Sequence, residues 1–384
     1  MTHMSDFSQL VPEHIRNLGG YTPGKSSRQA HRESRVNCIK MASNENPFGP
    51  SPKAVQAMQA VLSECHLYPD NDCADLRQKL VERYQVRPEQ IVPTAGSTAL
   101  LGIIARTLLS PGLNAITSQR SFIVYPIATQ AAGGKLIQVP MREDGYDLDD
   151  VAAAVDGNTR IIYLSNPNNP TGTIVTPAEV DRFLDQVPAH VVVVLDEAYC
   201  DFAEYFAQRR GVAYSHALDY VKQGRKVVVL RTFSKAHGLA GVRVGYGIGP
   251  SELMSYFARM RTTFSVSGVA QAGALAALAD DAHTQKALAN NAEQVPLLLE
   301  GMMELGYRVV PTWANFLYCE LGEEAAAVAK RMQAEGVIVR PLGPWGAPTA
   351  MRVTVGTPEQ NVIFLKAFRK VMERAVASKA TVET

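Results

Sequence analysis

Three short apolar runs rich in β-branched residues constrain the fold of this chain more than any other feature. They read IIYL (161–164), VVVVL (191–195) and KVVVL (226–230), and stretches with the hydrophobic period of a helix separate them. A strand that is apolar on both faces needs cover on both faces, which a parallel sheet with crossover helices supplies. The sequence therefore predicts an α/β fold.

The C-terminal part of the chain follows a different pattern. A long helical stretch begins at about residue 268, and we expect Pro296 to interrupt it. Beyond it, YRVVPTWANFLYCEL predicts two strands joined by a turn, AAAVAKRMQAEG a helix, VIVRPL and AMRVTVG two further strands, and EQNVIFLKAFRKVMERA a closing helix. A chain of 384 residues exceeds what one core usually organises. We expect an N-terminal arm with part of a small domain at 1–45, a large domain at 46–268 and a small α+β domain at 269–384.

Composition excludes several classes of function. The chain carries 38 basic and 37 acidic side chains, which argues against a nucleic acid or an anionic membrane as its partner. No apolar run approaches the ~18 to 20 residues of a membrane span, and the N-terminal segment lacks the pattern of a signal peptide, so we expect a cytoplasmic protein. The five cysteines and eight histidines are scattered without CxxC or HExxH spacing, so we expect no metal site.

Polar residues follow each of the three apolar runs. SNPNNPTG, with Asn169, comes after the first run; DEAY, with Asp196 and Tyr199, comes after the second; and TFSK, with Lys235, comes after the third. The carboxyl ends of parallel strands meet at one edge of a sheet, where loop amides and helix N-termini bind ligands. We therefore expect an amide, a carboxylate, a phenol and an amine to converge at this edge.

A phosphate-binding loop is predicted upstream, where AGSTALLGIIARTLL (95–109) begins a helix whose free amides favour an anion. A ligand that meets all of these groups needs a carbonyl for the amine, a basic ring nitrogen for the carboxylate and a phosphate for the helix start. Pyridoxal 5'-phosphate has all three. We predict that Lys235 forms a Schiff base with its aldehyde and that Asp196 keeps its ring nitrogen protonated. The phenolic oxygen is assigned to Asn169 and Tyr199, and the phosphate to Gly96, Ser97, Thr98, Thr232, Ser234 and Arg243.

Two neighbouring features receive a structural interpretation. Glu197 follows Asp196 on an extended strand end and should point the opposite way. GYGIG (245–249) lacks the GxGxxG spacing of a dinucleotide loop, so we interpret it as a glycine-rich strand beside the cofactor. This argues against a nicotinamide-dependent dehydrogenase.

The motifs resemble those of a known family across nearly the whole chain. SNPNNPTG, LDEAY, TFSKAHGLAGVRVGY and MRVTVGT, in this order, resemble the class I and II aminotransferases of PLP fold type I. MASNENPFGPSP, LYPDND and RVTVGTPEQN resemble the histidinol-phosphate aminotransferase subfamily, which includes related aromatic amino acid aminotransferases. The resemblance implies a large domain with a mixed, mostly parallel central sheet covered by helices, and a small α+β C-terminal domain.

The resemblance also assigns residues that the strand ends do not. It makes Phe122 the ring that stacks on the cofactor, and it brings Tyr68 to the cofactor phosphate of a neighbouring subunit, which implies a homodimer with shared active sites. Arg340 and Arg352 match residues that bind the anionic group of the substrate, Tyr21 matches an arm residue that closes over it, and Asn169 also faces it. Trp345, in the loop between the two arginines, receives no role.

The implied reaction is transamination between an amino donor and a 2-oxo acid such as 2-oxoglutarate. The donor remains open among histidinol phosphate, phenylalanine, tyrosine and others. A PLP-dependent decarboxylase of a phosphorylated amino acid would share almost every motif. A non-catalytic regulatory protein that keeps the fold is a more distant alternative, against which the intact set of Lys235, Asp196 and Arg243 speaks.

Overall fold

The larger part of the molecule is built around a seven-stranded sheet. The computed structural model describes residues 7–20, 23–25, 29, 32 and 37–382, with side chains to residue 373. Six strands of the sheet share one direction, and β10 runs antiparallel to both of its neighbours. The predicted runs are its three adjacent strands β7, β8 and β9, which confirms the α/β fold. In spatial order the strands are β2 (Ile91–Thr94), β10 (Gly245–Ile248), β9 (Val227–Thr232), β8 (Val192–Asp196), β7 (Thr159–Ser165), β3 (Asn114–Ser118) and β4 (Lys135–Val139).

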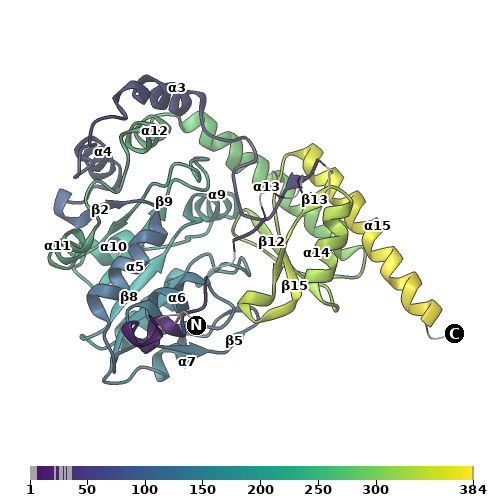
Figure 1. The fold of residues 1–384 in the computed structure, drawn as a ribbon, viewed down its shortest axis with the longest axis horizontal. Coiled ribbons are helices and arrows are strands. Elements are labelled where there is room, and N and C mark those ends of the chain that lie inside the picture. The colour runs from purple at the N-terminus through teal and green to yellow at the C-terminus, as the bar shows by residue number, and fades with distance from the viewer. Residues whose placement is uncertain (1–6, 21–22, 26–28, 30–31, 33–36, 383–384) are drawn as a thin grey trace, which may run out of the picture.

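Helices cover both faces of this sheet (Figure 1). Successive residues of β8 alternate between two cores, since Val193 and Leu195 join one hydrophobic cluster and Val192 and Val194 join the other. This arrangement explains why the runs are apolar throughout. One face packs against α5 (Ser97–Leu108), α6 (Val124–Ala131) and α11 (Ser251–Met260). The other packs against α3 (Pro52–Ala60), α4 (Ala74–Tyr84), α7 (Leu148–Ala153), α8 (Pro177–Gln186), α10 (Ala217–Lys222) and α12 (Gly268–Leu278).

A smaller lobe follows in the chain and lies to the right in Figure 1. Its antiparallel sheet has the order β11–β12–β15–β14, and the N-terminal strand β1 (Ile39–Lys40) pairs with β13 (Val337–Ile338) beside it. The predicted strands and helices of this lobe are present, except that VIVRPL forms two short strands, β13 and β14, which belong to separate sheets. The lobe contains α13 (Asp281–Met303), β11 (Arg308–Val310), β12 (Phe316–Glu320), α14 (Ala325–Ala334), β14 (Arg340–Leu342), β15 (Ala347–Thr354) and α15 (Pro358–Val382).

The prediction that Pro296 interrupts a helix is wrong. Helix α13 continues through Pro296, and the break lies earlier, between α12 and α13. A proline inside a helix removes one backbone hydrogen bond and costs ~3 kcal/mol. Val295, Leu298 and Met302 of the same helix are buried in the C-terminal core, and this burial offsets that cost.

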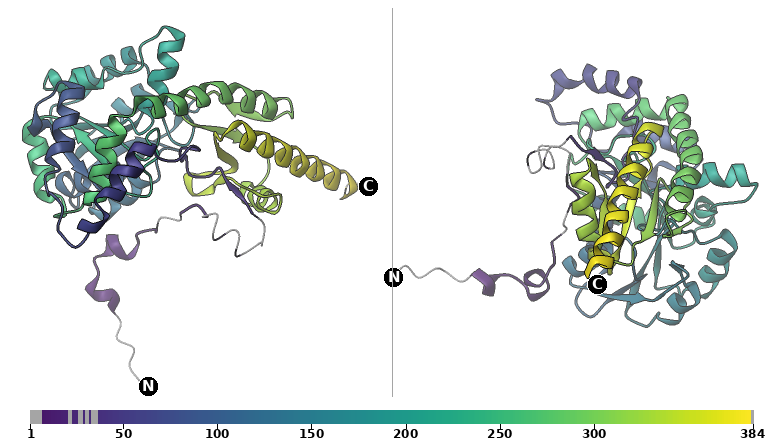
Figure 2. Two further views of the ribbon diagram at one scale, coloured as in Figure 1. Left: turned by 90° about the horizontal axis from the view of Figure 1, so that it is seen from above. Right: turned by 90° about the vertical axis from the view of Figure 1, so that its right-hand side faces the viewer.

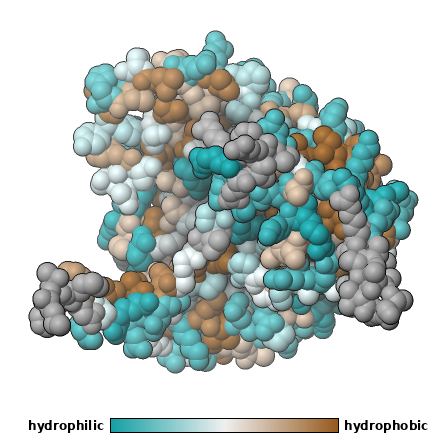
Figure 3. All heavy atoms as spheres, turned by 45° about the vertical axis from the view of Figure 1, so that its right-hand side comes forward, coloured by the Kyte–Doolittle hydropathy of each residue, from teal (hydrophilic) through white to brown (hydrophobic). Residues whose placement is uncertain are grey.

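The remaining elements are short. The N-terminal η1 (Phe7–Leu10) and α1 (Glu13–Arg16) lie at the periphery of the larger part (Figure 2), where Gln130 of α6 donates a hydrogen bond to the His14 carbonyl. Hydrophilic and hydrophobic side chains are mixed over the face of the molecule in Figure 3. Helix α9 (Cys200–Arg210) follows β8. Other short elements connect the main ones: η2 (Leu62–Glu64), η3 (Pro88–Gln90), β5 (Met141–Arg142), β6 (Gly145–Tyr146) and η4 (Gly343–Trp345). Within the part of the chain that the structure describes, no helix is long and apolar enough to cross a membrane, and no three His, Cys, Asp or Glu side chains are grouped to hold a metal.

Candidate active site

A cavity lined by residues of both lobes opens at the carboxyl edge of the large sheet. The strand register brings the predicted groups to this edge. Ser165 at the end of β7 lies opposite Asp196 of β8, and Gly245 at the start of β10 lies opposite both Thr94 and Thr232, where β2 and β9 end. The predicted residues that line the cavity are Ser97, Thr98, Phe122, Asn169, Asp196, Tyr199, Thr232, Ser234, Lys235, Arg243, Arg340 and Arg352.

Lys235 presents its amine to this cavity. Its Nζ donates a hydrogen bond to the Ser43 carbonyl at 3.1 Å and lies 5.6 Å from the centre of the Tyr199 ring. Burial lowers the pKa of Lys235 to about 7, and the positive charge of Arg352 acts in the same direction. A large fraction of the amine is therefore neutral near pH 7, which is the form that attacks a carbonyl carbon.

Asp196 is a buried carboxylate with one oxygen that accepts a side-chain hydrogen bond. The Tyr125 hydroxyl donates to Oδ2 at 3.0 Å, whereas Oδ1 is buried and has no hydrogen-bonding partner within the described part of the chain. Burial raises the pKa of Asp196 to about 6, and the hydrogen bond from Tyr125 opposes this rise. The carboxylate is thus mostly ionised at neutral pH, and it needs a further donor.

Tyr125 is a residue that the sequence analysis missed. It is fully buried on α6, and its ring stacks on Tyr163 of β7 with the centroids 4.7 Å apart. The stack fixes the direction of the hydroxyl toward Asp196. No motif or period marks Tyr125 in the sequence, because its partner lies 71 positions away.

Asn44 is a second residue that was missed, and it orients Tyr199. Its Nδ2 donates to the Tyr199 hydroxyl at 2.8 Å. Asn44 belongs to MASNENPFGPSP, a motif that the sequence analysis quoted without assigning a role to this residue. On the same side of the cavity, the Asn169 side-chain oxygen accepts a hydrogen bond from Arg352.

The predicted phosphate-binding loop lies at the N-terminus of α5. Gly96 precedes the helix with φ +88°, and a β-carbon built on it would lie 2.6 Å from an Arg243 guanidinium nitrogen. Thr232 donates from its hydroxyl to Ser234 Oγ at 3.0 Å. A β-carbon on Gly245 would lie 2.6 Å from the Ser97 nitrogen, which explains why a glycine-rich strand packs here. GYGIG is therefore a strand, as predicted.

Two buried arginines enter the cavity from the smaller lobe. Arg340 and Arg352 lie opposite each other on β14 and β15 and are 7% and 5% exposed. Arg352 donates to the Ala42 carbonyl at 2.9 Å as well as to Asn169. Two buried guanidinium groups on neighbouring strands give this end of the cavity positive charge, which suits a negatively charged ligand group.

Comparison with known proteins identifies the family. The family model described as "Aminotransferase class I and II" matches residues 36–368. The chain belongs to this family. It is 42% identical over 372 residues to histidinol-phosphate aminotransferase 2 of Pseudomonas aeruginosa, covering 96% of this chain and 99% of that protein. It is also 42% identical over 364 residues to histidinol-phosphate aminotransferase of Moorella thermoacetica, covering 94% of this chain and 92% of that one.

Solved structures agree with this assignment. The histidinol-phosphate aminotransferase of Sinorhizobium meliloti, solved in complex with pyridoxal 5'-phosphate, superposes with a TM-score of 0.86 at 26% identity, covering 97% of this chain and all of that one. The chain is thus a PLP-dependent aminotransferase of fold type I. Two features of the cavity fit the cofactor independently of the comparisons: the buried Oδ1 of Asp196 suits a ring N–H, and the Gly96 loop with Arg243 suits a phosphate.

Two predicted residues, Gly96 and Tyr68, and the neighbouring Glu197 do not line the cavity. Gly96 lies next to the Arg243 guanidinium, as described above. Tyr68 is 84% exposed and stacks on Phe264 with the centroids 4.7 Å apart, on the outer surface of this chain. Tyr21 lies outside the described residues. Glu197 points away from the cavity, where it accepts two hydrogen bonds from Arg231, so its predicted structural role is confirmed.

Proposed function

We propose that this aminotransferase uses histidinol phosphate as its amino donor and a 2-oxo acid such as 2-oxoglutarate as its acceptor. The observation that carries the proposal is the pair of buried arginines, Arg340 and Arg352, in the same cavity as the Lys235 amine. Two guanidinium groups side by side in one cavity require a ligand group that carries negative charge. A phosphate ester on the donor and the distal carboxylate of a dicarboxylic acceptor both satisfy this requirement. The names of the Pseudomonas and Moorella relatives support the same donor.

In this proposal Lys235 has two tasks. Its amine would attach the cofactor covalently. Once the donor has displaced it, the neutral amine would take the proton from the donor carbon that bears the amino group and pass it to the cofactor carbon that receives that group. The pKa of about 7 suits both tasks, because the amine exchanges its proton readily near neutral pH. Bound pyridoxal 5'-phosphate supplies the electron sink for the charge that develops at that carbon.

The other residues hold the cofactor and substrate in place. Asp196 accepts the ring N–H through Oδ1, and Tyr199 and Asn169 hydrogen-bond the phenolic oxygen. Ser97, Thr98, Thr232, Ser234 and Arg243 bind the phosphate, and Phe122 covers the ring. Since Asn169 also accepts from Arg352, the same amide links the cofactor's oxygen to the substrate's anion site.

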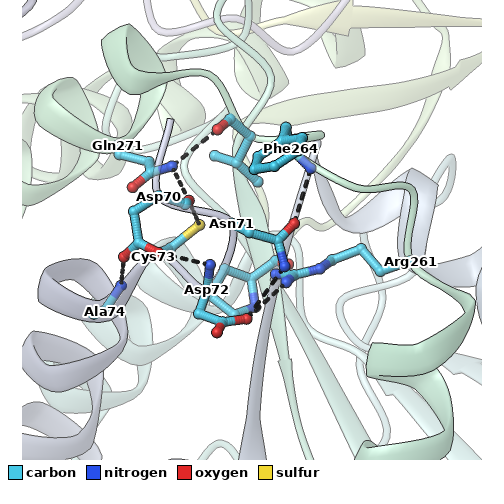
Figure 4. A network of polar contacts seen from close by, with 10 residues as sticks. Asp70, Asn71, Asp72, Cys73, Ala74, Arg261, Phe264 and Gln271 are labelled. Atoms are coloured by element: carbon cyan, nitrogen blue, oxygen red, sulfur yellow. Dashed lines mark hydrogen bonds and ion pairs between the residues drawn. The ribbon is translucent and has the colours of Figure 1, made fainter. Parts of the chain in front are cut away.

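We also propose that two chains form a homodimer in which Tyr68 reaches the partner's cofactor phosphate. Tyr68, Leu67 and Leu62 are large side chains that are 84%, 61% and 55% exposed on one segment. Hydrogen bonds tie the next turn of chain to the segment 261–271, because Asn71 accepts from the Phe264 amide and Gln271 donates to the Asp70 carbonyl (Figure 4). An exposed apolar surface on a fixed support suits a second copy of the chain.

The donor is tested by adding single amino donors to the holoenzyme without acceptor and following the cofactor's visible absorbance. We expect histidinol phosphate to convert the cofactor to its amine form fastest, and 2-oxoglutarate to reverse the change. Faster conversion by phenylalanine or tyrosine would assign an aromatic donor instead. Release of carbon dioxide without any acceptor would indicate the decarboxylase, and no change with any donor would indicate a regulatory protein.

A further inference from the structure

Trp345 lies at the anion-binding end of the cavity. It ends the short helix η4 between β14 and β15, it is 7% exposed, and it packs in a small cluster with Val310, Tyr318 and Ile123. The indole lines the active-site cavity and also a second cavity on its other side, and Phe122 is the other residue that borders both. Trp345 therefore forms part of the boundary between the active-site cavity and the second cavity.

The indole contacts both arginines of the anion site. The Arg340 guanidinium lies 4.9 Å from the Trp345 ring centroid, and the Arg352 guanidinium lies 6.0 Å from it. Arg352 is also held by the Ala42 carbonyl and by the Phe316 ring at 5.2 Å. The attraction to the indole face is therefore stronger for Arg340 than for Arg352, because the Arg340 guanidinium lies nearer to the ring.

The physical problem at this position is the approach of two like charges. Arg340 and Arg352 are directly opposed across an antiparallel pair, which destabilises the empty site. The negative face of an aromatic ring attracts a guanidinium and leaves its N–H groups at the edge free to point elsewhere. An indole beside both cations therefore offsets part of their repulsion and fixes the direction in which each guanidinium plane faces.

We propose that Trp345 is a positioning residue that sets the guanidinium groups of Arg340 and Arg352 for a phosphate or carboxylate. The inference rests on the proposed function, since it concerns the same anion site. It predicts that the ring face, rather than the bulk of the side chain, determines how tightly an anion binds. The cofactor site should not depend on it.

The test uses holoenzyme, so that the cofactor fills its own phosphate site, and inorganic phosphate as the probe in calorimetry. Trp345→Leu removes the ring, and we expect the Kd for phosphate to rise about fivefold to thirtyfold. Trp345→Phe keeps a ring face and should bind within about twofold of the parent. With histidinol phosphate as the substrate, Trp345→Leu should raise KM and leave kcat and the cofactor's Kd nearly unchanged.

Trp313→Leu is the matched control, because Trp313 also lies under an arginine, with Arg210 4.3 Å from its ring, but does not line the cavity. This control should bind phosphate like the parent. If Trp345→Leu does not fold, Trp345→Met is measured against the same criteria, and loss of cofactor from a folded ring-less variant would contradict the inference. Unchanged phosphate binding in the ring-less variant, or equal loss in Trp345→Phe, would overturn the inference alone. Failure of the parent to bind phosphate would overturn the proposed donor as well.

Discussion

Replacing Gly96 with alanine should weaken cofactor binding by more than its effect on protein stability explains. Gly96 has φ +88°, and its added β-carbon would lie 2.6 Å from a guanidinium nitrogen of Arg243. The Arg243 side chain is exposed, so its guanidinium can move away. The substitution should therefore displace a phosphate ligand without disturbing the core.

Both effects can be estimated. Gly96 has ψ 154° as well as a positive φ, and a side chain in this sparsely populated backbone region costs ~1 to 3 kcal/mol of folding free energy. Losing one charge-assisted hydrogen bond to the phosphate costs ~1.5 to 3 kcal/mol, which corresponds to a rise of about 10-fold to 150-fold in the Kd for pyridoxal 5'-phosphate. Urea unfolding of the apoprotein measures the first quantity, and titration of the apoprotein with cofactor measures the second.

Gly112→Ala is the matched control for this experiment. Gly112 has φ +92°, and no atom lies within 4 Å of its added β-carbon. The Gly112→Ala variant should lose stability because its φ is also positive, and it should bind the cofactor normally. The reasoning fails if Gly96→Ala binds cofactor as tightly as Gly112→Ala, or if its stability falls well below that of the control.

Three further predictions test other parts of the site. Tyr125→Phe removes the hydrogen bond to Asp196 and should destabilise the apoprotein by ~1 to 3 kcal/mol in urea unfolding; an unchanged midpoint would contradict the role of this hydroxyl. Covalent attachment of the cofactor should accelerate about tenfold from pH 6 to pH 8 and then level off, because Lys235 loses its proton near pH 7. A rate that keeps rising toward pH 10 would show an unshifted amine. Tyr68→Ala should weaken both dimerisation in sedimentation and cofactor binding, and an unchanged Kd would place this residue outside the active site.

The sequence was most informative where chemistry follows directly from a buried strand. Asp196 and Lys235 could be predicted because each comes after an apolar run, and parallel strands must end at the same edge. The contacts that orient them could not be predicted, since Tyr125 and Asn44 reach their partners across 71 and 155 positions. Such contacts depend on how the helices and lobes pack, which periodicity does not report.

The break before α13 illustrates the same limit. Local chemistry favours a break at Pro296, but burial of the surrounding residues outweighs the lost hydrogen bond. At the true boundary, Asp280 accepts a hydrogen bond from the Ser51 hydroxyl at 2.6 Å. A tertiary contact of this kind leaves no local signal in the sequence.

The most direct measurement of the central claim is to reduce the holoenzyme with borohydride and map the modified peptide by mass spectrometry. Borohydride converts a lysine–aldehyde linkage into a stable amine, so the cofactor remains on the residue that held it. We predict a single adduct on Lys235 and none in the Lys235→Ala variant. An adduct on another lysine, or cofactor that leaves the protein unmodified after reduction, would contradict the assignment of the active site.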